Sequence, residues 1–323
     1  MNIVILGAGG LGSVYGGYLA RGGQEVTLIA RPTHAEAIRR GGLHISGYEE
    51  FTVPVGPHLQ ATADAATVRQ ADLLLVTVKT KDTETALADV AHLRPAMVAS
   101  LQNGVLKDEQ LIQAFGAQVV LGAACILGAT LLGPGHAACT IFGMTWFGEL
   151  DDRRTERLEQ VVAAFRAAGL KVEVPDSIRS AEWSKLCQIL PAATLSALSR
   201  LEYHKVCQSP DLAYLFVKLT HECAAVAAAS GVSLGDYEGF NVKTLAEADF
   251  AEAVAMIQGR GRGLEARGMT EVRISMLQDV LAGRRTEIEA IAGDVVRRAQ
   301  RLGIAVPATE FAYRAIRGIE SWF

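Results

Sequence analysis

The chain has 323 residues, 50% of them hydrophobic and 20% charged, which predicts about two globular domains with sizeable cores. Its formal net charge of -4 offers no basic excess, so we expect no nucleic acid partner. No apolar run approaches the ~20 residues that span a bilayer, and the first residues, MNIVILGAGG, contain no basic leader segment. We therefore expect a cytoplasmic protein without a membrane partner.

The first half of the chain alternates between strand and helix patterns. Residues 2–6 predict a strand, 7–23 a helix and 25–30 a second strand, which together form a βαβ unit. Two further buried strands, each followed by a helix, continue this alternation, at 71–79 and 83–93 and then at 96–104 and 107–115. The pattern predicts an α/β fold, with a Rossmann-type, doubly wound parallel sheet covered by helices on both faces.

The pattern then changes twice. Residues 117–149 are rich in β-forming residues and predict an antiparallel extension at a sheet edge, followed by a helix at 153–168 and a short strand, KVEVP. From Ser177 onward the periodicity is helical, so we expect two domains, residues 1–176 and an all-α domain at 177–323.

Two segments of the second half have less certain roles. We expect a loop at residues 258–272, because glycine and arginine alternate there. The alanine-rich helix at 213–230 fits packing inside the domain or across a homodimer interface equally well.

The five cysteines (Cys125, Cys139, Cys187, Cys207 and Cys223) are scattered without CxxC spacing. This predicts neither a disulfide framework nor a metal site. We expect them to be small buried hydrophobic residues.

A glycine motif, GAGGLG, follows the first strand and opens the first helix, with Gly7, Gly9 and Gly12 at GxGxxG spacing. This context predicts a dinucleotide site. The first glycine allows a tight turn, the second lets the backbone approach a pyrophosphate, and the third lets helix and strand pack closely. The helix start at Gly10 and Leu11 would offer free N–H groups to the phosphates.

Arg31 stands at the end of the second strand, where an NAD-binding protein would place Asp or Glu. An arginine there favours the 2′-phosphate of NADP(H). An ordinary exposed loop arginine fits the same position.

Polar residues mark several other strand ends and helices. Lys79 and Asn103 follow two predicted strands, where ligands of doubly wound sheets bind. Lys185 lies among Trp183, Leu186 and Ile189 on an otherwise apolar helix, and Glu287 follows Thr286. Lys185 in such a setting would suit a general acid, although most lysines of this kind extend into water. Glu287 could equally belong to a capped helix start.

Six stretches of the sequence carry a resemblance to a known family: ILGAGGLGSVYGGYLA, LIAR, VTVKTKDTETAL, SLQNG, EWSKL, and the C-terminal SMLQDVLAGRRTEIEAIAGDVVRRAQRLGIAVPAT. Over essentially its whole length the chain resembles the ketopantoate reductase (2-dehydropantoate 2-reductase) family. The last stretch is the most specific, because its serine, RRTEIE and GIAVP occur in family order and spacing.

The resemblance implies NADPH-dependent reduction of a small 2-oxo acid, as in pantothenate biosynthesis. Lys185 matches the catalytic lysine that protonates the developing alkoxide, and Glu287 the glutamate that holds a substrate hydroxyl. Ser275 matches the serine that contacts the substrate carboxylate, and Asn103 the asparagine beside the nicotinamide. From the residues alone, Ser275 could also be a plain helix N-cap.

The sequence departs from the family at two positions. Ile189 and Ala193 stand where ketopantoate-reducing members carry asparagines, four and eight residues after the lysine. A polar substrate group left unmatched there would lose ~1–3 kcal/mol, so the reaction class is better supported than ketopantoate itself. Gln188 and Ser196 are nearby polar groups that could replace the amides.

Two other functions remain open from the sequence. A β-hydroxyacid or 6-phosphogluconate type dehydrogenase has a similar domain order and a catalytic lysine, but the SMLQD and RRTEIE segments argue against it. A non-catalytic NADPH-binding sensor would not need Lys185, Asn103, Ser275 and Glu287 together.

Overall fold

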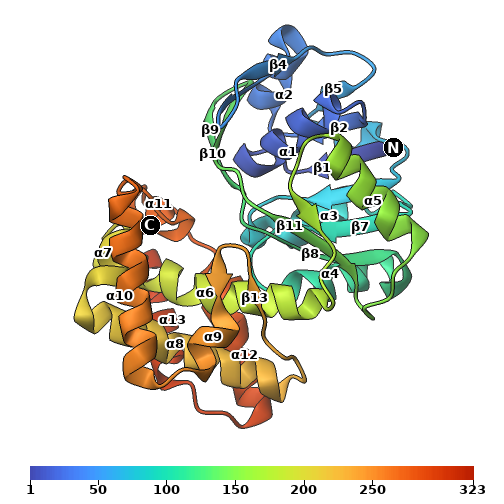
Figure 1. Ribbon diagram of the computed structural model, residues 1–323. Coiled ribbons are helices and arrows are strands. Elements are labelled where there is room, and N and C mark those ends of the chain that lie inside the picture. The colour runs from blue at the N-terminus through green and yellow to red at the C-terminus, as the bar shows by residue number, and fades with distance from the viewer. The chain divides into compact units, whose positions relative to one another are not determined.

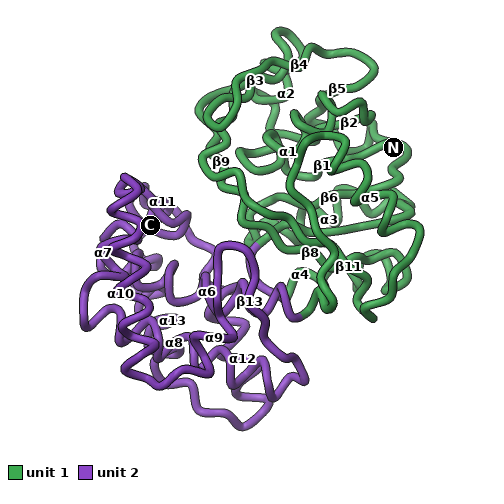
Figure 2. The backbone as a smooth tube through the Cα atoms, in the orientation of Figure 1, with its two compact units in different colours: residues 1–102, 106–179 green, residues 103–105, 180–323 purple.

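The computed structural model describes residues 1–323 as two compact units. The first comprises residues 1–102 and 106–179, and the second comprises residues 103–105 and 180–323 (Figure 2). The second unit therefore contains a three-residue piece of the N-terminal half of the chain.

The first unit is built on an eight-stranded sheet (Figure 1). Six neighbouring strands are parallel, and the two at one edge run the other way because β11 pairs antiparallel with β8 and parallel with the edge strand. In spatial order the strands are β12 (Val172–Glu173), β11 (Thr145–Glu149), β8 (Val120–Cys125), β7 (Met97–Ser100), β6 (Leu73–Val76), β1 (Asn2–Leu6), β2 (Glu25–Ile29) and β5 (Leu59–Thr62).

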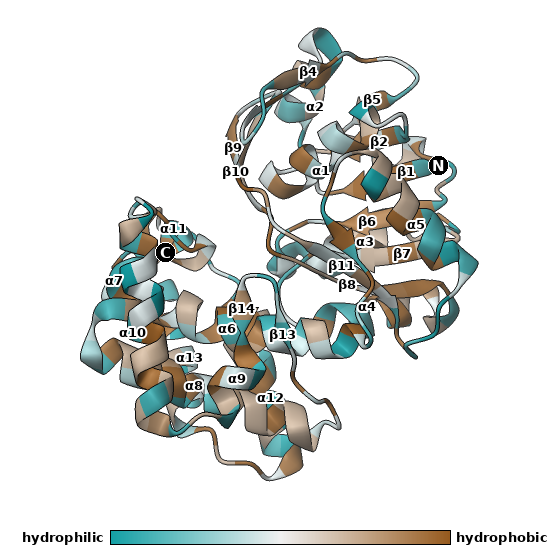
Figure 3. Cartoon of the chain, in the orientation of Figure 1, coloured by the Kyte–Doolittle hydropathy of each residue, from teal (hydrophilic) through white to brown (hydrophobic).

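Both faces of this sheet are buried, as the predicted strands require. Alternate residues of β1 and β6 enter two separate cores: Ile3 and Ile5 lie in one, Val4 and Leu6 in the other. Figure 3 shows the central strands as hydrophobic, with hydrophilic residues on the outside of α5. The first core is closed by α1 (Gly10–Arg21) and α5 (Glu156–Ala167), and the second by α3 (Thr83–Asp89) and α4 (Leu106–Phe115).

The predicted antiparallel extension is present, and part of it forms a second sheet. Strands β8 and β11 pair antiparallel at the edge of the main sheet, but the hairpin between them joins a four-stranded sheet. Sequence patterns did not predict β3, β4 or β5, which are short and only partly buried. The order in the second sheet is β4 (Phe51–Val53), β3 (Leu43–Gly47), β10 (His136–Ile141) and β9 (Gly128–Gly133).

The second unit is almost entirely helical, and one small hairpin, β13 (Asp236–Tyr237) with β14 (Phe240–Asn241), was not predicted. A π-helical turn, η4 (Glu289–Gly293), precedes α12. The helices are α6 (Ile178–Ser199), α7 (Tyr203–Gln208), α8 (Pro210–Ala229), α9 (Val242–Glu247), α10 (Phe250–Ala266), α11 (Ser275–Leu281), α12 (Asp294–Leu302) and α13 (Pro307–Glu320).

The prediction of a loop at residues 258–272 is wrong over most of that range, because α10 continues to Ala266. One of its glycines, Gly261, serves helix packing instead of a turn. A Cβ added at Gly261 would lie 2.8 Å from the carbonyl oxygen of His204 and 2.9 Å from Cβ of Cys207, both on α7. Only glycine lets the two helices approach this closely, and that contact outweighs its low helix propensity.

Helix α8 is long and apolar enough, by length and composition, to cross a membrane. Half of its most apolar window is buried inside the fold, and core helices of soluble proteins pass the same test. Its Glu222 is itself buried and accepts hydrogen bonds from the N–H groups of Ala308 and Thr309, at 3.1 and 2.8 Å. This carboxylate caps the start of α13 and complements its dipole.

The five cysteines are all buried and unpaired, as predicted.

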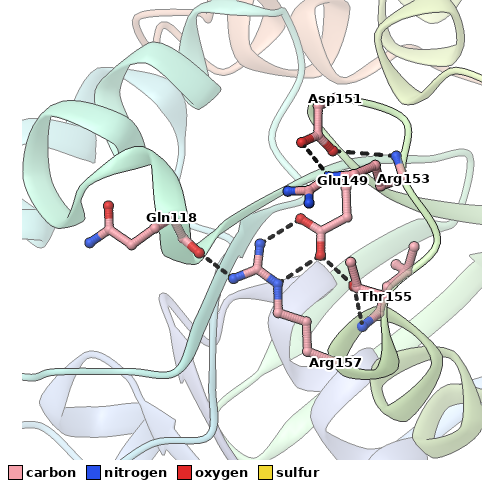
Figure 4. A network of polar contacts seen from close by, with 7 residues as sticks. Gln118, Glu149, Asp151, Arg153, Thr155 and Arg157 are labelled. Carbon is pink, nitrogen blue, oxygen red and sulfur yellow. Dashed lines mark hydrogen bonds and ion pairs between the residues drawn. The ribbon is translucent and has the colours of Figure 1, made fainter.

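A buried carboxylate fixes the antiparallel edge of the main sheet (Figure 4). Glu149, at the end of β11, is only 4% exposed and accepts hydrogen bonds from Arg157, at 2.7 and 2.5 Å, and from Thr155. Arg157 also donates to the carbonyl oxygen of Gln118. Burial alone would raise the pKa of Glu149, but the bonds from Arg157 and Thr155 outweigh it and hold the pKa below its usual value.

We predict that Glu149→Gln lowers the free energy of unfolding by about 1–3 kcal/mol, because Arg157 loses its ionised partner. Since the pKa is depressed in the folded state, this contribution is present above about pH 4.5 and lost as the pH falls through the folded value. Urea unfolding at pH 7 and pH 4 measures both effects. Asp151→Asn, in the exposed pair with Arg153, is the matched control and should change little. Equal losses at the two pH values would contradict the prediction.

Candidate functional site

The glycine motif lies at the carboxyl end of β1, and its three glycines differ in their surroundings. Gly7 has φ +96°, and a Cβ there would lie 2.6 Å from the backbone nitrogen of Val78. A Cβ at Gly12 would lie 2.9 Å from both the Gly7 oxygen and Cγ2 of Ile5, so this glycine lets α1 pack on β1. A Cβ at Gly9 meets nothing closer than 4.0 Å. The backbone at Gly9 is therefore open to a ligand.

The start of α1 offers the polar groups that a pyrophosphate needs. The N–H groups of Gly10, Leu11 and Gly12 have no hydrogen-bond acceptor, and the N-cap Gly9 provides no side-chain cap. With the positive end of the helix dipole, these donors fit an anionic group. Gly10 has a second role, because a Cβ there would lie 2.9 Å from the backbone nitrogen of Leu131 on β9.

Hydrogen bonds connect the carboxyl ends of three neighbouring strands, β1, β6 and β7, beside this motif. Thr77, after β6, donates a hydrogen bond of 2.9 Å to the Gly7 carbonyl, and Gln102, after β7, donates one of 2.9 Å to the Val78 carbonyl. From β1 the chain runs to β2 and β5 on one side and to β6, β7 and β8 on the other. The motif thus lies where strand order reverses, the usual ligand site of such sheets. Lys79 follows at this edge and is exposed.

Arg31 lies just beyond the end of β2, as the residue before α2 (Pro32–Gly41), and is exposed. No side-chain partner is recorded for it, so its guanidinium is available to a ligand. The helix that follows is held by buried His34. Its Nδ1 accepts the N–H of Gly135 at 2.9 Å, so Nε2 donates to the Ser13 hydroxyl at 2.9 Å. Burial lowers the pKa of His34, which favours this neutral form.

In the second unit, Lys185 lies on α6, a helix whose position is fixed by two unusual contacts. Pro191 lies inside the helix and has no N–H for the carbonyl of Cys187. The hydroxyl of Thr220 donates to that carbonyl instead, at 3.4 Å. The hydroxyl of buried Ser184, beside Lys185, accepts the N–H of Gly235 at 2.9 Å. The backbone that carries Lys185 is therefore held by neighbouring segments on two sides.

Lys185 is also one of the few residues of this helix that are only partly buried. Between residues 181 and 197 every residue is buried except Lys185, Gln188 and Ile189. These three occupy adjacent turns of one face. Ala193, in contrast, is only 1% exposed. Ser196 is also buried, and its hydroxyl has no hydrogen-bond partner. The half-buried strip is therefore Lys185, Gln188 and Ile189, which we call the α6 strip.

The segment 103–105 brings Asn103 to the region of Glu287. Gly104 has φ +85°, and a Cβ there would lie 3.3 Å from the carbonyl carbon of Ala290 in η4. Glu287, immediately before this π-helical turn, is 8% exposed. π-helical turns are rare in proteins, and those that occur are often found at functional sites. Asn103 and Glu287 are thus both near in sequence to the contact between Gly104 and Ala290.

Ser275 and Thr286 were both possible helix caps from the sequence, and only Thr286 makes a capping hydrogen bond. Ser275 is the first residue of α11, and the N-cap is Ile274, so Ser275 does not cap the helix. Its hydroxyl has no recorded hydrogen-bond partner. Thr286, by contrast, does accept the N–H of Ile288 at 3.1 Å, which gives Glu287 a local structural setting.

A polar cluster beside the α6 strip was not predicted from the sequence. The side chain of Gln188 donates to the Tyr203 hydroxyl at 2.6 Å and accepts from Arg260 at 2.6 Å. We call Gln188, Tyr203 and Arg260 the Arg260 cluster. Arg260 was assigned to a loop, yet Ala253, Ile257, Gly261 and Leu264 have the helical spacing of a buried face and could have indicated α10.

No group of three or more His, Cys, Asp or Glu side chains is placed to hold a metal ion.

Comparison with known protein families shows which family the chain belongs to. The family model described as Ketopantoate reductase PanE/ApbA matches residues 3–152, and the model of its C-terminal part matches residues 177–320. The chain belongs to the ketopantoate reductase family. It is therefore an oxidoreductase, and the resemblance seen in the sequence motifs is confirmed.

Individual members of the ketopantoate reductase family match over nearly their full length. The 2-dehydropantoate 2-reductase of Archaeoglobus fulgidus is 31% identical over 99% of this chain and 98% of that protein. A crystal structure of a family member from Ralstonia eutropha is 33% identical, with a TM-score of 0.82 and 99% of each chain covered. A D-mandelate dehydrogenase with NADH and anilino(oxo)acetate shares the fold at 22% identity, with a TM-score of 0.85. These structures confirm the predicted fold class.

We predict that Gly9→Ala leaves the free energy of unfolding within about 0.5 kcal/mol of the wild type, since the added methyl has room. Affinity for a nicotinamide dinucleotide should nevertheless fall by about tenfold or more, because that methyl occupies the approach to the helix N-terminus. Fluorescence titration and urea unfolding measure the two quantities. Gly10→Ala should instead destabilise the fold, because it would contact β9. Unchanged dinucleotide affinity of Gly9→Ala would argue against this site.

Proposed function

We propose that the chain is an NADPH-dependent reductase that converts a 2-oxo acid into the 2-hydroxy acid, with ketopantoate as the leading candidate substrate. Residues 1–176 would bind the cofactor, and residues 177–323 would bind the substrate and supply the proton donor. The observation that carries this proposal is the position of Lys185, the one cation on the α6 strip of a ketopantoate reductase family member.

The cofactor assignment is supported by the glycine motif and by Arg31. The open backbone at Gly9 and the free N–H groups at the start of α1 fit a pyrophosphate. Arg31, exposed at the end of β2, can pair with a 2′-phosphate and would gain nothing from the ribose hydroxyl of NADH. Lys79 adds a second positive charge at the same sheet edge. The bound cofactor would supply the hydride.

The chemistry required of the protein is a proton for the alkoxide that forms as the keto carbon is reduced. An ammonium group aimed at that oxygen provides both the proton and electrostatic stabilisation of the negative charge. Lys185 suits this role because its backbone is held by neighbouring segments while its side chain lies on the α6 strip. Asn103 and Ser275 would orient the cofactor and the substrate carboxylate, and Glu287 would hold a substrate hydroxyl.

The substrate proposal is weakened at one position. Ile189 places an apolar group on the α6 strip where ketopantoate-reducing relatives have an amide, whereas buried Ala193 cannot contact a ligand on that strip. Gln188, which could have replaced the missing amide, has its side chain engaged by Tyr203 and Arg260. These facts make 2-oxo acids with an apolar substituent the main alternative to ketopantoate, whose hydroxyl would then depend on Glu287 alone.

We predict that Arg31→Ala raises KM for NADPH by roughly 10- to 100-fold and leaves KM for NADH unchanged, because only NADPH carries the 2′-phosphate. Steady-state kinetics with each cofactor provide the test. Arg40→Ala, at an exposed arginine of α2, is the matched control. Equal effects on both cofactors would contradict the NADPH assignment.

We predict that Lys185→Ala lowers kcat by about 10²- to 10⁴-fold while NADPH binding persists, as expected when a general acid is lost. The assay follows NADPH oxidation with a panel of 2-oxo acids that includes ketopantoate. Lys205→Ala, an exposed lysine paired with Glu202, should retain full activity. If the wild type reduces no member of the panel, the reductase proposal fails; if it turns over ketopantoate as well as apolar 2-oxo acids, the argument from Ile189 is wrong.

A further inference from the structure

Arg260 is a half-buried cation that forms no ion pair with Asp or Glu. Its recorded partners are the side-chain oxygen of Gln188, at 2.6 Å, and the hydroxyl of Tyr203, at 3.4 Å. Both partners are formally neutral. Other half-buried arginines of the chain differ in this respect: Arg157 pairs with Glu149, and Arg298 pairs with Asp294 at 2.7 Å.

Tyr203 does not neutralise this charge. Burial raises the pKa of the Tyr203 hydroxyl to about 12, although the nearby Arg260 opposes that change. At neutral pH the phenol is therefore protonated, and the Arg260 cluster carries one net positive charge. Removing a charge from water without an opposite charge is unfavourable, so the cluster fits an anionic partner supplied by a ligand.

The location of the Arg260 cluster indicates what that ligand is. Gln188 belongs to the α6 strip, and Lys185 lies one helical turn away, at roughly 5–6 Å between Cβ atoms. The backbone N–H of Tyr203 also donates a 3.1 Å hydrogen bond to the carbonyl of Val272, in the segment that leads to Ser275. The cluster therefore connects the α6 strip with the start of α11.

We propose that Arg260 binds the carboxylate of the substrate and determines specificity for 2-oxo acids. The inference rests on the proposed function, since it places the keto oxygen near Lys185. In a 2-oxo acid the carboxylate is bonded directly to the keto carbon, so Lys185 and Arg260, which bonds to Gln188 one turn from Lys185, can contact the two groups of one small molecule. Gln188 and Tyr203 position the guanidinium, and Ile189 places the apolar substituent beside it.

A purely structural role for Arg260 predicts a different outcome. If its bonds to Gln188 and Tyr203 mainly held α10 against α6 and α7, then Arg260→Gln would destabilise the unliganded protein. If it is a ligand site, removal of the unpaired charge should leave that stability unchanged or higher, because binding sites are commonly kept at a cost to stability.

Oxamate and oxamide provide a matched pair of probes for the test. Oxamate is an isostere of a small 2-oxo acid with an ionised carboxylate, and oxamide is its neutral counterpart. With NADPH saturating, calorimetry should show that Arg260→Gln weakens oxamate binding by roughly 10- to 100-fold and leaves any oxamide binding unchanged. Arg260→Lys should restore part of the affinity, since it keeps the charge but lacks the planar fork.

Arg262→Gln, an exposed arginine two residues along α10, is the matched control and should bind oxamate as the wild type does. Thermal unfolding of the unliganded Arg260→Gln protein should show no loss of stability. Wild-type affinity of Arg260→Gln for oxamate, or a large loss of its stability, would overturn the role of Arg260 and leave the reductase proposal intact. Failure of the wild type to bind oxamate and to reduce any 2-oxo acid would overturn both.

Discussion

A cation can be enclosed in a folded chain only where an anion or a set of polar groups compensates for the lost water. The chain satisfies this constraint in two ways. Arg157 and Arg298 have carboxylate partners within the fold, and these pairs fix a sheet edge and a helix. Arg260 has only neutral partners, and Lys185 lies at the one opening of a buried helix. Arg157 and Arg298 thus support the fold, whereas the neutral surroundings of Arg260 indicate where an anionic ligand would bind.

The glycines of the first unit meet a second constraint, which is the close approach of backbone to backbone. Gly7, Gly12 and Gly10 each lie where a Cβ would meet neighbouring atoms, and they bring α1 against β1, the loop after β6 and the β9–β10 hairpin. Gly9 has no such neighbour. Packing therefore explains three of the four glycines, and the fourth is better explained by a ligand.

Much of the fold could be predicted because its signals are local. The buried runs of β1, β2, β6 and β7 and the helices between them follow from hydrophobic periodicity. Strands β3, β4 and β5 were missed because they are short and partly buried, and β3 pairs with the distant β10. The α10 error has a similar origin. Gly261 has a low helix propensity, and its contact with α7 cannot be seen from sequence alone.

The candidate site shows the same limit. The glycine motif, Arg31 and Lys185 stand in recognisable patterns, and the structure places the motif where strand order reverses. The Arg260 cluster joins residues from α6, α7 and α10, which no single pattern connects. Ser275 could be read as an N-cap because caps have the same composition one position earlier or later, and only the backbone shows that Ile274 is the cap.

Residues 103–105 belong to the second unit although residues on both sides of them belong to the first. The helical unit is therefore discontinuous in sequence. The residue that lies against Ala290, Gly104, comes from the N-terminal half of the chain, which is synthesised first. A fragment that begins at Ser180 would lack this piece, whose Gly104 lies against Ala290 of the π-helical turn. A chimera that takes the helical unit from a relative would therefore have to take residues 103–105 with it.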